Sequence, residues 1–108
     1  TTRRPPLTHP IPDTETTERQ REAFLEEFRN VAPLVLEEAG CIEYGATIDA
    51  STEIDRQAPL RDKTVTIVEK WSDVDALRAH LDAEHMAAYR ERVVDLVAGA
   101  TLRILEPA

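Results

Sequence analysis

The segment from Lys63 to His85 contains the pattern that most limits how this chain can fold. Its first nine positions alternate between two faces, which is typical of a β-strand. One of these faces is apolar except for a single carboxylate. It carries Val65, Ile67, Glu69 and Trp71. Ser72 then ends the strand and can cap a helix, in which apolar residues recur at helical spacing. The segment therefore predicts a strand that carries a carboxylate and an indole and runs directly into a helix.

A long amphipathic pattern before this segment predicts the first helix, from Asp13 to Ala39. Thr17 can cap it, because Gln20 three residues later completes a capping box. The apolar positions form one stripe, made of Phe24, Leu25, Phe28, Val31, Ala32, Val35, Leu36 and Ala39. Pro33 lies inside the pattern and removes a backbone donor, so we expect the helix to be kinked or split near Asn30.

The other elements follow in the order strand, loop, strand, helix, helix, strand. We expect them at Cys41–Ala50, Ser51–Asp62, Lys63–Trp71, Asp73–Ala83, Glu84–Ala98 and Thr101–Glu106. The loop is longer than most hairpin connections, so it is either mobile or covers another part of the molecule. This order predicts an α+β fold, a ferredoxin-like sandwich with the helices on one face of an antiparallel sheet.

Alternation also assigns the side chains of the strands to two faces. Those of the second strand that we expect to face the helices are Ile42, Tyr44, Ala46 and Ile48. The opposite face of the sheet then carries Cys41, Thr47, Thr66, Val68, Arg103 and Leu105. This face is too mixed to be a core and too apolar to be plain surface, so we expect it to be partly buried in a dimer.

The composition excludes several classes of function. The net charge of −8 argues against a nucleic-acid partner, because nucleic-acid binding needs a basic surface. Neither metal-ligand spacing nor a glycine-rich phosphate loop occurs, so we expect no metal and no nucleotide cofactor. No apolar run is long enough to span a bilayer, and we expect no membrane partner. The single cysteine, Cys41, excludes an internal disulfide and fits a cytoplasmic protein.

Glu69 is the most informative candidate residue, because a carboxylate on an apolar face must find a partner or become neutral. It is either a general base or an orienter of His80, or else it makes a structural salt bridge or a bond to a helix end. Trp71 offers a flat apolar wall with one donor, which suits an aromatic ligand. An ordinary core tryptophan would show the same pattern.

Two histidines and two tyrosines complete the set of candidates. His80 lies at the edge of the apolar stripe of its helix and can titrate near neutrality, so it is either a base or a surface or capping histidine. His85 opens the next helix and either joins the site or satisfies backbone groups at the break between helices. Tyr44 and Tyr89 can each place a hydroxyl in a cavity, although both also suit a core.

Two motifs, in this order, resemble the antibiotic biosynthesis monooxygenase family. The first is E-x-G-C-x-x-Y, from Glu38 to Tyr44, and the second is E-x-W-S-x-x-x-A-L-x-x-H-L, from Glu69 to Leu81, with a further histidine after it. The resemblance extends from Phe24 to Ile104. It implies a homodimeric α+β barrel in which two sheets pack face to face, and a cavity lined by the tryptophan at position 71.

The resemblance implies a monooxygenase that needs no cofactor and acts with O2 on a small aromatic, quinol-like or polyketide compound. In this hypothesis His80 and Glu69 are the catalytic residues. The substrate site would be lined by Trp71, Tyr44, His85 and Tyr89. Two alternatives stay open: a haem-degrading monooxygenase of the same fold, and a non-catalytic dimeric module that binds a small molecule or serves in stress.

The first twelve residues depart from the family pattern. The family opens with an apolar strand that often supplies a polar active-site residue, commonly Asn, whereas residues 1–12 include four prolines. Proline cannot donate to a sheet ladder, which makes a central strand improbable here. We expect an arm or a poor edge strand over residues 7–11, with the family's first strand missing or displaced. The domain itself is expected over residues 13–108.

Overall fold

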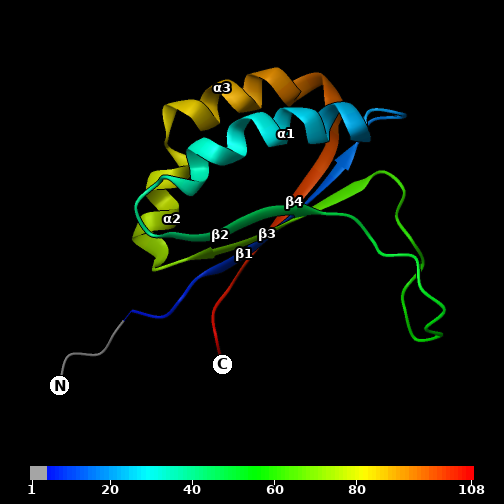
Figure 1. Ribbon diagram of the computed structural model, residues 1–108, viewed down its shortest axis with the longest axis horizontal. Coiled ribbons are helices and arrows are strands. Elements are labelled where there is room, and N and C mark those ends of the chain that lie inside the picture. Colours follow the sequence, from blue (N-terminus) through cyan, green and yellow to red (C-terminus); the bar gives the residue numbers. More distant parts are fainter. Residues whose placement is uncertain (1–4) are drawn as a thin grey trace.

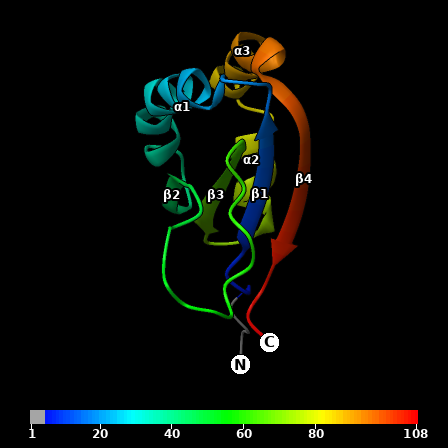
Figure 2. The same cartoon turned by 90° about the vertical axis from the view of Figure 1, so that its right-hand side faces the viewer.

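The alternating segment forms an inner strand, β3 (Thr64–Trp71), in a computed structural model that describes residues 5–108. Its buried positions are Val65, Ile67, Glu69 and Trp71, as the pattern predicts. Around it the chain forms β1 (His9–Thr16), α1 (Arg21–Leu36), β2 (Cys41–Thr47), α2 (Val74–Leu81), α3 (Glu84–Val93), the 3-10 turn η1 (Val94–Leu96) and β4 (Val97–Leu105). The strands form an antiparallel sheet in the order β2-β3-β1-β4, with the helices on one face (Figures 1 and 2). This confirms the predicted ferredoxin-like α+β sandwich.

The proline-rich segment forms an inner strand, which corrects the expectation of an arm or an edge strand; residues 1–4 of that arm lie outside the described chain. The N–H group of Thr8 donates to the carbonyl of Trp71 on β3 at 3.0 Å, and that of Thr16 donates to the carbonyl of Lys63, the residue before β3, at 2.7 Å. Pro10 and Pro12 lie between these threonines, at two positions where the backbone N–H group of any other residue would also point toward β3.

The ladder on that side is accordingly interrupted between Thr8 and Asp13, while pairing with β4 runs through both prolines, opposite Ile104 and Leu102. Proline is tolerated inside this sheet because both missing donors face the same neighbouring strand.

Helix α1 begins at Arg21 and not at Asp13, because residues 13–16 pair in the sheet. Thr17 is not its cap: the N–H of Thr17 donates to the carbonyl of Leu96 at 2.9 Å, and Gln20 occupies the N-cap position. The helix is not split at Pro33 but continues to Leu36. Pro33 lies in the last turn, where the missing donor costs a single hydrogen bond.

Two further features differ from the sequence pattern: the side-chain directions at the start of β2 and the boundary between the last helix and β4. A bulge after Cys41 places this residue opposite Trp71, on the helix side, and leaves Ile42 53% exposed. The last helix ends at Val93, and β4 already begins at Val97, where we expected helix to Ala98. Pairing with β1 decides this, because the ladder reaches from Leu105 to Val97 opposite Thr16.

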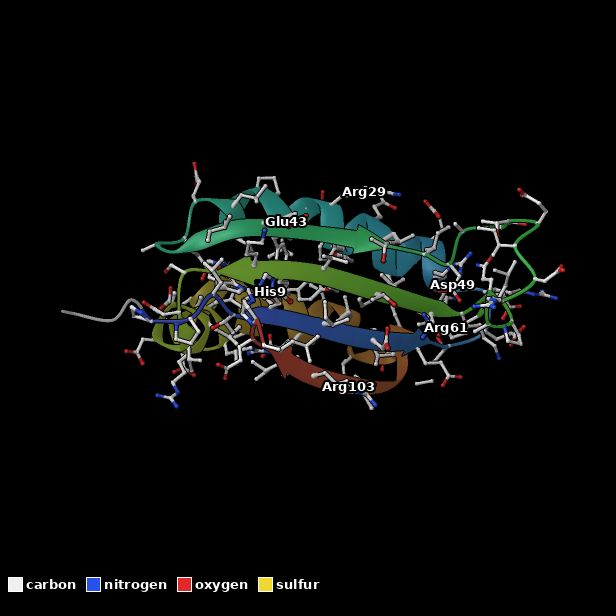
Figure 3. The ribbon with its side chains drawn as sticks, turned by 90° about the horizontal axis from the view of Figure 1, so that it is seen from below. His9, Arg29, Glu43, Asp49, Arg61 and Arg103 are labelled. Carbon is white, nitrogen blue, oxygen red and sulfur yellow. The ribbon has the colours of Figure 1, made fainter. Side chains whose placement is uncertain are left out.

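The core fills the space between the helices and the inner sheet face. Helix α1 contributes five buried residues of the predicted stripe, whereas Leu36 is 52% exposed and Ala39 lies beyond the end of the helix and is exposed. The other members of the core come from β2, β3, α2 and α3, and the whole set is Phe24, Leu25, Phe28, Val31, Val35, Tyr44, Val65, Ile67, Trp71, Leu77, Met86, Tyr89 and Val93. The opposite face, called the outer sheet face below, carries no helix within the described chain (Figure 3). This arrangement leaves one side of the sheet to hold a site and the other side open.

The connection between β2 and β3 is irregular and projects beyond the end of the sheet (Figure 1). Arg61 fixes its base, since its guanidinium donates to both carboxylate oxygens of Asp49 at 2.8 and 3.0 Å. Asp13 on β1 lies 3.6 Å from the same guanidinium. These bonds hold the pKa of Asp49 at about 2, below its usual range.

Candidate active site

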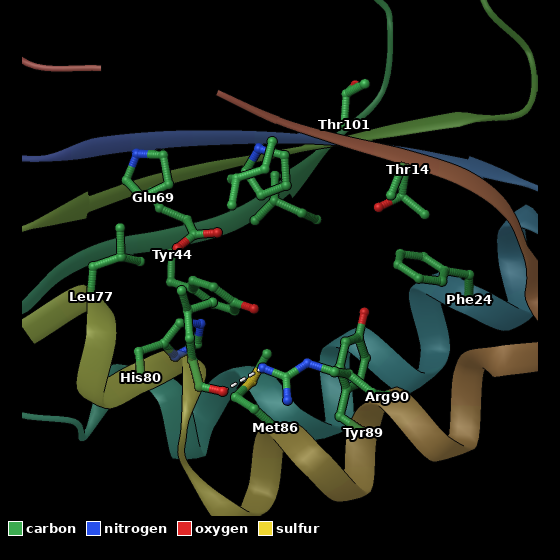
Figure 4. A pocket seen from close by; sticks show the side chains of 16 residues that line it. Thr14, Phe24, Tyr44, Glu69, Leu77, His80, Met86, Tyr89, Arg90 and Thr101 are labelled. Carbon is green, nitrogen blue, oxygen red and sulfur yellow. Dashed lines mark hydrogen bonds between the residues drawn. The ribbon is translucent and has the colours of Figure 1, made fainter. Parts of the chain in front are cut away.

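A cavity of about 310 Å³ lies between the inner sheet face and helices α2 and α3 (Figure 4). Its sheet wall includes Pro10, Pro12, Ile67 and Ala100, which are short or rigid side chains that leave space beneath the helices. Its polar lining comes from both layers: Thr14, Tyr44, Glu69, His80, Tyr89, Arg90 and Thr101. The cavity therefore has apolar walls with a few convergent polar groups, which is typical of a small-molecule site.

Glu69 lies on the sheet wall of this cavity and is only 5% exposed. One carboxylate oxygen, Oε1, accepts a hydrogen bond from Nε1 of Trp71 at 2.9 Å. Burial raises the pKa of Glu69 to about 7; the Trp71 bond opposes this rise, and the nearby charge of Glu38 adds to it. The carboxyl group therefore keeps its proton at pH values at which an ordinary glutamate is fully ionised.

His80 faces Glu69 from helix α2 and is 2% exposed. Its Nδ1 lies 2.9 Å from Oε2 of Glu38, a residue in the turn between α1 and β2. The imidazole packs against the rings of Trp71 and Tyr44, with ring centroids 4.7 and 5.5 Å away. Burial lowers the pKa of His80, which the bond to Glu38 partly opposes, so the ring is a neutral base at neutral pH.

Trp71 and His85 are near the site but are not part of the cavity wall. Trp71 is fully buried and lies behind Glu69 and His80, in contact with both. His85, at the start of α3, places Nε2 2.8 Å from Oε2 of Glu38. Both were expected to contact the substrate. Trp71 instead lies against two residues of the cavity wall, and His85 lies against Glu38, which is itself behind His80.

Tyr44 and Tyr89 both line the cavity and both belong to the hydrophobic core, so each of the two interpretations left open by the sequence describes them. The ring of Tyr44 stacks on Phe28 with centroids 5.1 Å apart, and that of Tyr89 meets the edge of Phe24 at 6.1 Å. Burial raises the pKa of each phenol above its usual value, so both stay protonated. They can donate hydrogen bonds but cannot serve as bases.

Comparison with known proteins assigns the family. The sequence profile described as antibiotic biosynthesis monooxygenase matches residues 14–92, most of the chain. The chain belongs to this family. The Escherichia coli K12 and Shigella flexneri proteins named "Probable quinol monooxygenase YgiN" are each 34% identical over 90 residues, which covers 83% of this chain and 86% of theirs.

Solved structures agree on the fold. PA3566 from Pseudomonas aeruginosa superposes with a TM-score of 0.79 at 20% identity, over 99% of both chains. Rv0793 from Mycobacterium tuberculosis gives 0.77 at 18% identity, over 94% of this chain and 95% of its own. At these identities the similarity establishes the architecture alone.

Two residues at or beside this cavity were missed from the sequence. Glu38 was noted only as the first letter of a motif, and its meeting with His80 spans 42 residues of chain. Arg90 lines the cavity, and its Nη2 donates to the carbonyl of Leu81 at 2.6 Å, which joins α3 to the end of α2 (Figure 4). Its position four residues after Met86, on the stripe of α3, is the signal that could have indicated it.

The cavity of this family member combines an acid, a base and a cation. Near neutrality His80 can accept a proton, Glu69 can donate one, and Arg90 supplies a positive charge at the same cavity. Within residues 5–108, no group of three or more His, Cys, Asp or Glu side chains is arranged so that it could hold a metal ion. No helix in this range is both long and apolar enough to cross a bilayer.

Proposed function

We propose that this protein is a cofactor-independent monooxygenase that oxidises a small quinol-like aromatic compound with O2. The observation that carries the proposal is that His80 and Glu69 line one cavity with pKa values displaced in opposite directions, down for the base and up for the acid. Such divergent pairs are typical of acid–base sites. The name of the E. coli relative, 34% identical, supports the quinol as substrate class.

The chemistry begins with proton transfer from a phenolic hydroxyl of the substrate to His80. The resulting anion is electron-rich and reduces O2 directly, and Arg90 stabilises its negative charge in the apolar cavity. Protonated Glu69 donates a hydrogen bond to the substrate anion and, being neutral, adds no second negative charge to the cavity. For a quinol the reaction balances as quinol plus O2 giving hydroxyquinone plus water: one oxygen atom enters the ring and the other leaves as water.

The size and walls of the cavity favour a compact substrate. A volume of about 310 Å³ is at the lower end of the usual range for ligand pockets. Phe24, Tyr44 and Tyr89 supply aromatic surface, while Leu77 and Met86 supply aliphatic surface. A flat molecule of one or two rings suits this space. The role of Trp71 in this proposal is to orient Glu69 and support His80 from behind.

We also propose that the protein works as a homodimer joined through the outer sheet face. That face exposes apolar side chains on a sheet that helices cover on the other side only, and Leu105 on it is 48% exposed. Val68 on β3 points the same way, opposite Gly45. Packing two such sheets face to face would remove this apolar surface from water.

The first prediction tests the base. His80→Asn keeps a side-chain N–H that can replace the Nδ1 donor to Glu38 but removes the nitrogen that accepts the proton. We expect oxygen uptake with a panel of small quinols to fall roughly 100-fold or more, the usual scale for a lost general base. Arg78→Asn is the control, because Arg78 lies on α2 like His80 but is 73% exposed and outside the cavity, and it should retain the parental rate.

Three results would contradict the proposal. One is a parental rate in His80→Asn. Another is quinol binding by the parental protein without any oxygen uptake, which would indicate the non-catalytic module. The third is a strong Soret band on haem titration together with haem loss, which would indicate the haem-degrading alternative.

A further inference from the structure

Glu38, His80 and His85 form a cluster beside the cavity that the proton transfer above does not explain. Oε2 of Glu38 lies 2.9 Å from Nδ1 of His80 and 2.8 Å from Nε2 of His85. Two histidines therefore share a single carboxylate oxygen. The Glu38 side chain is 14% exposed, so these bonds are shielded from water on most sides.

The cluster determines which nitrogen of His80 carries a proton. An ionised carboxylate only accepts hydrogen bonds, so the nitrogen that faces it must be an N–H. In a neutral imidazole the other nitrogen then has the free lone pair. Nδ1 is engaged by Glu38, which leaves Nε2 of His80 as the nitrogen that can accept a proton in the cavity.

A close approach of two turns brings Glu38 to this position. Gly40 has φ +83°, and a Cβ added to it would lie 2.6 Å from both Cβ of Ala76 and Oγ of Ser72. The N–H of Ser72 donates to the carbonyl of Gly40 at 2.8 Å. Ala76 and His80 are four residues apart on α2 and share a face. The turn between α1 and β2, which contacts Ala76 at Gly40, therefore places Glu38 beside His80.

His85 has the opposite effect on His80. It occupies the same oxygen, and when protonated it would add a positive charge beside the ring. His85 is 26% exposed at the start of α3, whereas His80 is 2% exposed. The ionisable groups that face the cluster from the surrounding elements are Cys41 and Tyr44 on β2, Glu69 on β3 and Arg90 on α3.

We propose that Glu38 is a positioning residue that holds His80 with Nδ1 protonated and Nε2 toward the cavity, and that His85 weakens this hold by sharing the same oxygen. The catalytic consequence rests on the proposed function, because it matters only if His80 is the base. The tautomer and the opposed effects of the two neighbours do not rest on it. A measurement on the histidine ring itself therefore separates the two proposals.

The second prediction concerns the ring nitrogens, which long-range proton–nitrogen NMR spectra of the labelled protein distinguish. Above the histidine titrations, His80 should show Nδ1 protonated and Nε2 unprotonated. Its titration midpoint should move down in Glu38→Gln, which loses the carboxylate charge, and up in His85→Ala, which returns the oxygen to His80 alone. Glu37→Gln makes the same change at the exposed neighbouring position and should leave the midpoint in place.

The same variants have a kinetic readout. Glu38→Gln should lower kcat roughly 10- to 100-fold with little change in KM, the scale seen when partners that orient a histidine are removed. An Nε2-protonated His80 in the parental protein would overturn the proposal even if Glu38→Gln fails to fold. Midpoints that move in the same direction in Glu38→Gln and His85→Ala would overturn it as well. Absence of quinol turnover in every protein, with the expected NMR results, would refute the proposed function and leave the positioning role of Glu38 standing.

Discussion

Glu69 shows how a single residue on an alternating strand acquires chemistry from its neighbours. The alternating pattern of the sequence predicts its position on the apolar face, and burial there raises its pKa to about 7. Trp71, two residues later on the same face, donates to it instead of exposing its ring to the cavity. A carboxyl group that is protonated in the folded protein but ionised in the unfolded chain must make stability depend on pH.

The third prediction follows from that dependence. The folded protein binds the Glu69 proton more tightly than the unfolded chain does, so stability falls as the pH rises from about 4.5 to about 7. The full loss is about 3 kcal/mol for a pKa of about 7 against the ordinary 4.5. Urea unfolding at several pH values should show this fall in the parental protein and not in Glu69→Gln, which keeps an acceptor for Trp71. If the free energy of unfolding changed with pH in the same way in both proteins, the raised pKa of Glu69 would be contradicted.

At the scale of elements, the site depends on how the α1–β2 turn meets the β3–α2 turn. Neither turn carries a side chain of the cavity wall, yet their contact at Gly40 fixes where Glu38 lies relative to α2. Gly40 needs both a positive φ and an absent side chain here. The meeting of these two turns therefore links local backbone geometry to the orientation of His80.

The fourth prediction is that Gly40→Ala destabilises the fold and disturbs the site together. A positive φ costs an alanine roughly 1–2 kcal/mol, and the clash with Ala76 adds to this cost. We expect the free energy of unfolding in denaturant to fall by at least about 2 kcal/mol, with a shifted His80 titration in the folded fraction. Gly99→Ala is the control, because a Cβ there meets no atom within 4 Å. Equal stability losses in the two variants would argue against the close approach.

At the scale of the whole molecule, the two faces of the sheet have different surroundings. The inner face is covered by helices and holds the cavity, while the outer sheet face combines apolar and charged side chains such as Glu43, Arg61 and Arg103 (Figure 3). Thr66 and Val68 on β3 lie near the middle of this face. A partner with the same surface would cover these positions.

The fifth prediction is that the protein is a dimer in solution, with about twice the chain mass by light scattering at micromolar concentration. Val68→Lys should shift it to a monomer, because a buried charge without a partner opposes association. Val94→Lys places the same charge on η1, at a side chain that is already 66% exposed, and should leave the dimer intact. A monomeric parental protein, or the same mass in solution for the two variants, would contradict an interface on the outer sheet face.

The sequence by itself determined the parts of this protein that follow from local periodicity. The alternation through β3, the helix that follows it, the buried part of the α1 stripe and the sandwich topology were all predicted, because side-chain direction in strands and helices repeats over a few residues. The same reasoning placed Glu69 on the inner face and His80 on α2. For Tyr44 and Tyr89 the sequence left both the core and the cavity open, and in the structure each belongs to the core and also lines the cavity.

Only the tertiary structure decided the rest. Residues 9–16 form an inner strand because Pro10 and Pro12 direct their missing donors to the same neighbour, which depends on how β1 lies between β3 and β4. Pairing with β3 creates the bulge after Cys41, which turns Cys41 toward the helices and Ile42 away from them, the reverse of the predicted directions. Glu38 meets His80 across 42 residues of chain because two turns touch at a glycine. Strand partners and contacts between distant turns are set by packing of the whole chain, and short-range patterns do not contain that information.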